Sequence, residues 1–299
     1  PSGSVTPTAA GSFNYLANPS AYGYPDATNT GSADKGTLTQ VSGTVTLTAG
    51  QTLSNTYVVG RVVLSGSSGT APTITNCYIQ NSSGSPALDC SGWNGSNQPQ
   101  ITDTTITTTN TEAGVCIAGT GSNSVANFLR VDASGAQDII HNGYSAWQDS
   151  YIHDCLRNAA GTSHADLCQL TSGNVTMTHC TAHPNHSSDF QNSVLEIGEQ
   201  SGDVGNIVFS DCLLGGGNYT FNANWNSTSP NVDTNWAVGS AFRGPHNFGS
   251  LTVENCRFAR VGGAYFPPQY GTKTHVSSPP SGTYTWTNNI YDDDGSTAS

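Results

Sequence analysis

Ile74-Thr75-Asn76-Cys77-Tyr78-Ile79 is the stretch that decides the fold, because its pattern returns along most of the chain. An apolar residue is followed by a polar one, by Asn or Asp, by a small residue and then by apolar residues again. Alternating apolar positions predict strands with one buried face, and Asn and Asp suit tight turns. Further copies are Ile101-Thr102-Asp103-Thr104-Thr105-Ile106, Trp147-Gln148-Asp149-Ser150-Tyr151-Ile152, Met177-Thr178-His179-Cys180-Thr181-Ala182, Phe209-Ser210-Asp211-Cys212-Leu213-Leu214, Val253-Glu254-Asn255-Cys256-Arg257-Phe258 and Trp286-Thr287-Asn288-Asn289-Ile290-Tyr291.

The copies recur at intervals of roughly 20 to 45 residues, which suits coils of a parallel β-helix with loops of different length. One copy cannot bury its apolar face alone, whereas stacked coils bury it continuously. Cys180, Cys212 and Cys256 share one position of the repeat and could form an internal ladder. A β-sandwich is the alternative fold, since it also has short strands with turn signals.

Nothing in the chain resembles a linker, so we predict one all-β domain. Residues 1–35, rich in Gly, Pro, Ser and aromatic residues, are expected to form an irregular N-terminal cap. Residues 36–291 are expected to form the coils, with long side loops, and residues 292–299 a frayed tail or terminal cap.

Charged residues make up 9% of the chain, with 8 Lys and Arg against 20 Asp and Glu and a net charge of −12. This composition argues against nucleic-acid binding, which needs a basic face. No stretch approaches the roughly 18 consecutive apolar residues of a membrane span. We therefore expect a secreted protein, and six Asn-x-Ser/Thr sequons are compatible with that.

The eight cysteines form no CxxC pair, so a zinc ribbon is not indicated. Disulfides are plausible in an oxidising compartment. The alternative is that the cysteines are small buried residues in the stack.

Several segments resemble the pectate-lyase-like right-handed parallel β-helix family, which occurs in secreted actinobacterial proteins and in phage tails. The resemblance covers most of the chain and rests on Gly23-Tyr24-Pro25-Asp26-Ala27-Thr28-Asn29-Thr30-Gly31, Ser150-Tyr151-Ile152-His153-Asp154, His164-Ala165-Asp166-Leu167-Cys168-Gln169, Leu213-Leu214-Gly215-Gly216-Gly217-Asn218-Tyr219-Thr220 and Asn289-Ile290-Tyr291-Asp292-Asp293-Asp294-Gly295. It implies a right-handed helix and, for many members, polysaccharide cleavage. Leu167-Cys168 stands where the family usually has Gly-Ile. The basic pattern of true pectate lyases and the full set of polygalacturonase carboxylates are absent.

Three successive coils can be aligned through their apolar residues. Asp138-Ile139-Ile140-His141 falls over Asp166-Leu167-Cys168-Gln169, and that segment over Ser193-Val194-Leu195-Glu196. In this register Asp138 and Asp166 lie on adjacent coils, about 4.8 Å apart. His141, Gln169 and Glu196 form a second column, and His164 points to the same side as Asp166.

Two close carboxyl groups raise one another's pKa, which is the arrangement that glycoside hydrolysis uses. We take Asp166 with Asp138 as the catalytic pair, Glu196 as a further acid and His164 as a residue that orients Asp166. A lyase would instead need a base and a group that neutralises a uronate, for which Arg157 and His164 are available. Alternatively, these side chains only satisfy turns and neighbouring backbone.

Aromatic rings stack on the apolar faces of sugars, so Tyr144, Trp147, Tyr219 and Trp225 are candidate binding platforms beside His141, Gln169 and Arg157. The alternative is that the rings pack against the coils. His183, His186 and Asp189 have the residue types of a metal site, and Asp292 to Asp294 could hold Ca²⁺, although a solvated acidic tail is the simpler interpretation. We otherwise expect no cofactor.

Two functions remain open at this point. The first is a secreted glycosidase or polysaccharide lyase, with hydrolysis slightly favoured. The second is a non-catalytic, glycan- or receptor-binding or structural β-helix of a phage tail or cell-surface assembly, possible also as a homo-oligomer. An enzyme should gather the acids at one site, whereas a structural part should use them in bonds to the backbone.

Overall fold

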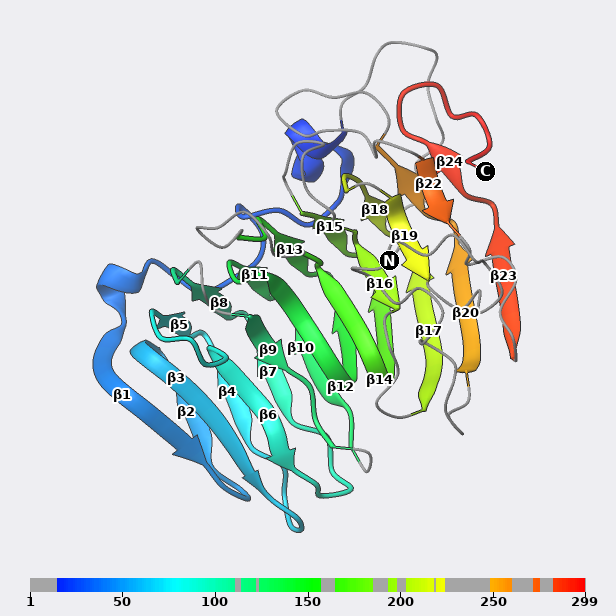
Figure 1. Cartoon of the computed structure of the whole chain (residues 1–299). Coiled ribbons are helices and arrows are strands. Elements are labelled where there is room, and N and C mark those ends of the chain that lie inside the picture. Colours follow the sequence, from blue (N-terminus) through cyan, green and yellow to red (C-terminus); the bar gives the residue numbers. More distant parts are fainter. Residues whose placement is uncertain are drawn as a thin grey trace.

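The computed structural model describes residues 15–110, 114–121, 124–156, 165–184, 193–197, 203–217, 219–223, 248–259, 271–274 and 282–298. These residues form an all-β structure in which 24 strands join into one sheet and the strand pairs are parallel. The strands lie side by side in a long stack, from the N-terminal coils at one end to the C-terminal ones at the other (Figure 1). This arrangement is compatible with the predicted parallel β-helix.

The strands pair in three ladders, and each coil contributes one segment to each ladder. The first ladder is β3 (Thr56–Gly66), β5 (Tyr78–Asn81), β8 (Thr105–Thr108), β11 (Asp132–Ser134), β13 (Tyr151–His153), β15 (Thr181–His183), β18 (Leu213–Leu214), β21 (Arg257–Phe258) and β24 (Ile290–Tyr291). β1 (Thr39–Leu47) pairs with β3 along its whole length.

The second ladder runs from β3 through β6 (Leu88–Trp93), β9 (Val115–Ala118), β12 (Asp138–Gln148), β14 (Cys168–Thr178), β16 (Leu195–Ile197) and β19 (Tyr219–Ala223) to β22 (Gly271–Thr274). The third ladder is β2 (Thr52–Ser54), β4 (Thr73–Thr75), β7 (Gln100–Thr102), β10 (Ala126–Leu129), the second halves of β12 and β14, β17 (Val204–Ser210), β20 (Phe248–Glu254) and β23 (Thr283–Thr287).

The recurring Asn or Asp forms the corner between the third and first ladders. In all seven copies of the repeat this residue, including His179 in the fourth, has a left-handed backbone with φ between 48° and 56°. Asn55 and Arg130 have the same conformation and mark two further copies that the sequence pattern did not reveal. The turn prediction is therefore confirmed, because Asn and Asp tolerate this conformation better than most residues.

The residue after each corner points inward and forms a buried column. The amide of Cys180 donates to Cys212 Sγ at 3.5 Å, and the amide of Val131 donates to Ser150 Oγ at 3.0 Å. The internal ladder predicted for Cys180, Cys212 and Cys256 is thus confirmed. All eight cysteines are buried free thiols, so disulfides gain no support and the alternative of small buried residues describes the structure.

A second corner, between the second and third ladders, depends on stacked glycines. Gly143 and Gly173 occupy register-matched positions in β12 and β14 and have φ of 77° and 97°. A Cβ at Gly173 would overlap the carbonyl oxygen of Gly143. Only glycine allows this backbone to turn while neighbouring coils remain in contact.

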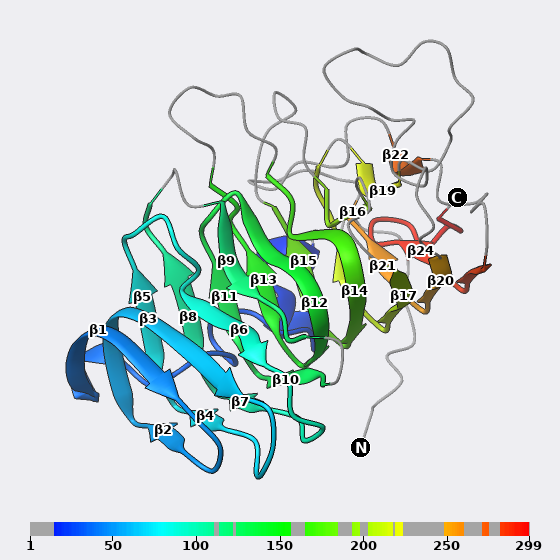
Figure 2. The ribbon, with the colours of Figure 1, turned by 60° about the horizontal axis from the view of Figure 1, so that its bottom comes forward.

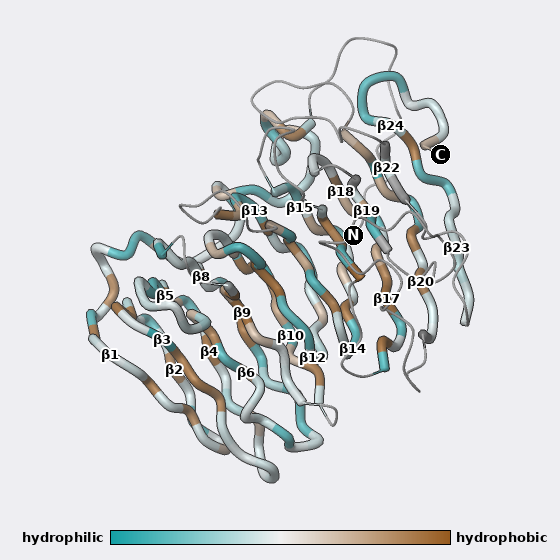
Figure 3. Tube along the Cα trace, viewed as in Figure 1, coloured by the Kyte–Doolittle hydropathy of each residue, from teal (hydrophilic) through white to brown (hydrophobic). Residues whose placement is uncertain are grey.

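The apolar side chains point into the stack, and the colours of Figure 3 alternate along the strands accordingly. The centre of the third ladder is filled by large buried side chains, for example Ile74, Ile101, Phe128, Trp147 and Met177. This continuous core is what stacking of the repeats predicted.

The N-terminal segment lies along the side of the stack. It contains three short 3-10 helices, η1 (Tyr15–Ala17), η2 (Pro19–Tyr22) and η3 (Lys35–Thr37). Leu16 packs with Leu213 and Ala259, while the amides of Gly31 and Ala33 donate to Arg130 O and Asn76 Oδ1. The segment is irregular as predicted, but its described part runs along the first ladder.

The C-terminal residues fold back on the last coil. Ile290 forms an antiparallel bridge with Thr297, and Trp286 Nε1 donates to the carbonyl of Ala298 at 2.9 Å. Ala298 is buried, which favours the terminal cap over a frayed tail.

Candidate functional site

The predicted register of the acidic residues is correct. Ile140 pairs with Cys168, and Cys168 pairs with Leu195. The amide of Ile139 donates to Asp166 O at 3.1 Å, and the amide of Leu167 donates to Ser193 O at 3.0 Å. Asp138, Asp166 and Ser193 therefore occupy equivalent positions on three consecutive coils, where the chain enters the second ladder.

Three buried carboxyl groups gather at this place, those of Asp138, Asp166 and Glu196. Asp138 Oδ1 accepts the backbone amide of Asp166 at 3.3 Å, and Asp166 Oδ1 accepts the hydroxyl of Ser193 at 2.6 Å. Asp166 is only 1% exposed, yet its Oδ2 has no hydrogen-bond partner. In the part of the chain that the structure describes, neither aspartate forms an ion pair with a basic side chain.

This environment favours the protonated acids. Burial raises the pKa of Asp166 to about 7, against the lowering effect of the Ser193 hydrogen bonds. Burial, and then the charge of Asp166, raise the pKa values of Asp138 and Glu196 well above their ordinary range. The cluster therefore shares protons among its carboxyl groups near neutral pH.

The second predicted column is also in register. His141 pairs with Gln169, Gln169 with Glu196, and Glu196 with Asn222. Burial lowers the pKa of His141, although a hydrogen bond with Gln169 acts in the opposite direction. His141 and Gln169 are half-buried, so this column is the accessible side of the cluster.

Other predicted site residues have different outcomes. Tyr144 is half-buried in β12. Trp147 is 1% exposed and packs face to face on Phe128 with ring centroids 3.9 Å apart, so the prediction of a sugar-stacking platform was wrong. Outside the described residues lie Arg157, His164, His186, Asp189 and Trp225, and also the side chain of Tyr219.

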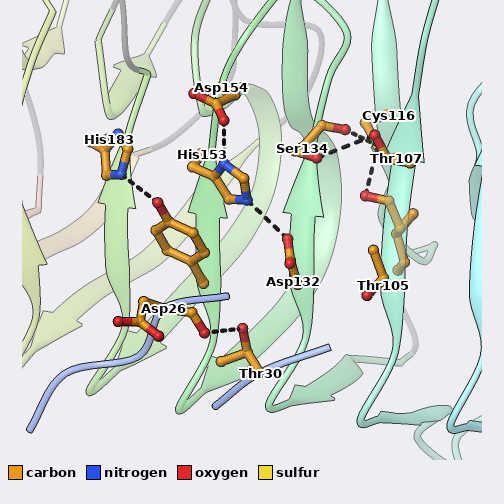
Figure 4. Close-up of polar contacts among 12 residues, drawn as sticks. Asp26, Thr30, Thr105, Thr107, Cys116, Asp132, Ser134, His153, Asp154 and His183 are labelled. Carbon is orange, nitrogen blue, oxygen red and sulfur yellow. Dashed lines mark hydrogen bonds and ion pairs between the residues drawn. The ribbon is translucent and has the colours of Figure 1, made fainter. Parts of the chain in front are cut away.

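A cluster of imidazoles and carboxylates that sequence reasoning missed lies on the first ladder. His153 Nε2 is 2.9 Å from Asp132 Oδ1, and His153 Nδ1 is 2.7 Å from Asp154 Oδ2 (Figure 4). Tyr151 Oη is 2.9 Å from His183 Nε2. Aligning the repeats one residue further would have placed His153 and His183 in one column, because β13 and β15 pair there.

The two clusters border the same corner of the stack. Cys155 lies in it, and its amide donates to Pro184 O at 3.2 Å. Burial raises the pKa of the Cys155 thiol, and the charges of Asp166, Asp138 and Asp154 add to this effect. The thiol is thus within electrostatic range of the carboxyl groups on both ladders.

His153 should make stability depend on pH. Burial lowers its pKa, but the hydrogen bonds to Asp132 and Asp154 outweigh burial and raise it to about 9. A rise from 6.5 to about 9 corresponds to about 3 kcal/mol of stabilisation. This contribution is present below pH 6.5 and is lost as the pH rises through 9. We expect the melting temperature to fall between pH 7 and pH 10.

The matched variant His153→Gln tests this assignment. Its melting temperature should be lower than that of the wild type at pH 6, and the two values should converge at pH 10. Differential scanning fluorimetry in buffers of constant ionic strength gives both curves. A constant difference across this range would contradict the assignment.

The metal predictions gain no support. His183 lies in strand β15, and no group of three or more potential ligands occurs among the described residues. Asp292 is buried, which corrects the interpretation of this end as a solvated acidic tail.

Comparisons with protein-family models, with curated proteins and with solved structures find no match to this chain. The resemblance to pectate-lyase-like proteins therefore stays a prediction. Within the described residues no helix has the length and apolar character needed to cross a membrane.

Proposed function

We propose that the chain is a secreted right-handed parallel β-helix that hydrolyses glycosidic bonds of a polysaccharide at Asp138, Asp166 and Glu196. Three ladders of parallel strands, with one segment of each coil in each ladder, support the β-helix. The buried carboxyl groups on consecutive coils, with no described cation paired to the two aspartates, carry the proposal for the chemistry.

Burying carboxyl groups without a compensating cation costs folding free energy. Groups of this kind with strongly shifted pKa values are concentrated at functional sites. If these positions were only structural, Asn or Gln would fill them at a lower cost in folding free energy. Gln169 and Asn222 do so at the neighbouring positions of the second column. The presence of three acids is what favours catalysis.

Asp166 is the general acid in this mechanism. With a pKa of about 7 it is partly protonated at neutral pH and can give its proton to the leaving glycosidic oxygen. When Asp166 holds the proton, its charge no longer raises the pKa of Asp138, which in its ionised form serves as nucleophile or base. Positions in register on adjacent coils lie about 4.8 Å apart, close to the carboxyl separation of about 5–5.5 Å in retaining glycosidases. The half-buried His141 and Gln169 contact the sugar.

A lyase is less well supported, because β-elimination needs a cation to neutralise the uronate carboxylate. Among described residues whose side chains are placed, the cationic groups are engaged elsewhere. Arg61 pairs with Asp89 and Arg130 with Asp103, Arg257 stacks over Tyr15, and Lys35 lies over Tyr57 and Tyr78.

A non-catalytic, binding or structural β-helix is the second candidate. The observation in its favour is that Asp138 accepts the backbone amide of Asp166 across adjacent coils. Such a bond stabilises a coil without any chemistry. A part of a phage tail or cell-surface assembly would use the carboxyl groups in this way.

A substrate screen separates these functions. Neutral and uronic polysaccharides are incubated with the wild type and with Asp166→Asn, and reducing ends and the ultraviolet absorbance of unsaturated uronates are measured. Hydrolysis predicts new reducing ends without absorbance, lost in the variant. Absorbance would establish the lyase. Folded wild-type protein that is inactive on the whole panel would leave the binding or structural role.

A further inference from the structure

The outward face of the third ladder differs from that of the first in its chemistry. In each strand the central residue points into the core, and the two residues flanking it point outward. On the nine strands these outward positions are Thr52, Ser54, Thr73, Thr75, Gln100, Thr102, Asn127, Leu129, Ala146, Gln148, Thr176, Thr178, Val208, Ser210, Thr252, Glu254, Thr285 and Thr287. We call this set the threonine face.

The threonine face is nearly uncharged although the chain carries a net charge of −12. Glu254 is its one charged member, and none of its positions holds an aromatic residue. None of its residues is buried. By contrast, the outward positions of the first ladder include Asp132, His153 and Arg257, and the described part of the N-terminal segment runs along that ladder.

Eleven of the 18 positions carry the hydroxyl of Thr or Ser, and the others are Gln100, Asn127, Leu129, Ala146, Gln148, Val208 and Glu254. Figure 2 shows β2, β4, β7 and β10 side by side. Outward residues of one strand lie about 6.6 Å apart, and neighbouring coils about 4.8 Å apart. Nine coils thus extend over about 38 Å. The hydroxyls of Thr52 and Thr73, on adjacent coils, form a hydrogen bond of 2.8 Å that fixes the orientation of both side chains.

These spacings are close to those of hexagonal ice. Hydrogen bonds of about 2.7–2.8 Å in a tetrahedral network place second-neighbour oxygens about 4.5 Å apart, and the perpendicular repeat is about 7.3 Å. The coil spacing of about 4.8 Å differs from the first value by about 7%, and the outward-residue spacing of about 6.6 Å differs from the second by about 10%. A sugar polymer would instead call for aromatic platforms, and a charged partner for charges, and the threonine face offers neither.

We propose that the threonine face binds ice. Its methyl groups order neighbouring water into cages, while its hydroxyls replace water molecules of the lattice. Charged side chains would hold hydration shells that do not fit the crystal, which accounts for a single charge on so long a face. Because its residues are fixed on paired strands, adsorption costs little conformational entropy. The site is separate from the carboxyl cluster.

The variant Thr75→Lys tests the proposal, since Thr75 lies between Ser54 and Thr102 in a block of hydroxyls. The matched control is Ser42→Lys, which places the same charge on exposed β1, outside the face. Thermal hysteresis and partition of the protein into a slowly growing ice front are measured for the folded wild type and both variants.

We expect hysteresis and partition into ice for the wild type, reduction of hysteresis to less than half in Thr75→Lys, and no change in Ser42→Lys. Asp166→Asn should also keep its ice affinity, which makes this test independent of catalysis. Folded wild type without hysteresis or partition would overturn the proposal. So would adsorption to microcrystalline cellulose or chitin, sensitive to Thr75→Lys, in the absence of ice binding.

Discussion

Asp166→Asn is expected to lower kcat on the substrate found in the screen by about 10²–10⁴-fold, the usual contribution of a general acid. The amide keeps the size of the side chain and can still accept the hydroxyl of Ser193, which lies 2.6 Å from Asp166 Oδ1. It cannot donate a proton to a leaving oxygen. KM should change little, because in the proposed function the half-buried His141 and Gln169 contact the sugar. Initial rates across a range of substrate concentrations measure both constants.

The pH profile gives a second readout that a structural role would not alter. Activity of the wild type should fall as the pH rises through about 7, where Asp166 loses its proton. Ser193→Ala removes a hydrogen bond that lowers the pKa of Asp166, so the alkaline limb should move to higher pH. If the limb stays in place, Asp166 is not the acid.

Asp166→Asn should stabilise the fold near neutral pH although it lowers activity. The pKa of Asp166 is raised by folding from 3.8 to about 7, so the folded state holds the proton more tightly and loses stability as the pH rises between these values. Asparagine does not ionise. Asp166→Asn should therefore melt at a higher temperature than the wild type at pH 8, and the difference should shrink at pH 4.

Asp211→Asn is the matched control for both readouts. Asp211 is an exposed corner residue with φ of 55°, which Asn also tolerates. It should leave kcat and the pH dependence of melting unchanged. Loss of activity in both variants, or in neither, would contradict the assignment of Asp166.

The repeat predicted both the corners and the register because each follows from local chemistry. Asn76, Asp103 and Asn255 adopt the left-handed turn that their side chains tolerate. The apolar pairs Ile139-Ile140 and Val194-Leu195 can bury their faces in only one register, since a shift by one residue would expose them. Because of that constraint, the sequence alone is sufficient to align Asp138 with Asp166.

The partner of His153 in the imidazole cluster could not be predicted from the same pattern. His153 and Asp132 are 21 residues apart in the sequence but lie on adjacent strands, β13 and β11. At the corner before β11, Arg130 stands where the repeat has Asn or Asp, and Val131 stands where it has a small residue. The sequence pattern therefore did not identify this copy. Without it, no partner for His153 could be assigned. The path of the N-terminal segment depends on single contacts, such as Leu16 on Leu213, which carry no periodic signal.

Trp147 shows how the repeat can correct an interpretation based on residue type. It occupies the same inward position as Ile101 and Met177 in the third ladder, and its register partners are Phe128 and Met177. Its indole Nε1 donates to Ser145 Oγ at 3.1 Å, inside the stack. An aromatic residue at an inward position therefore packs in the core.

Trp147→Ala should consequently destabilise the protein by about 3–5 kcal/mol, because the cavity cannot be filled by neighbours held in ladders. The parallel ring contact with Phe128, at 3.9 Å and 3°, adds to the loss. Trp147→Phe keeps one ring and should cost less than half as much. Urea unfolding followed by circular dichroism measures both, with Tyr144→Ala as a half-buried control whose loss of stability should be about 1 kcal/mol.

Glycan affinity of Trp147→Phe should equal that of the wild type. A large loss of glycan affinity with unchanged stability would instead show that Trp147 binds the sugar and does not pack in the core.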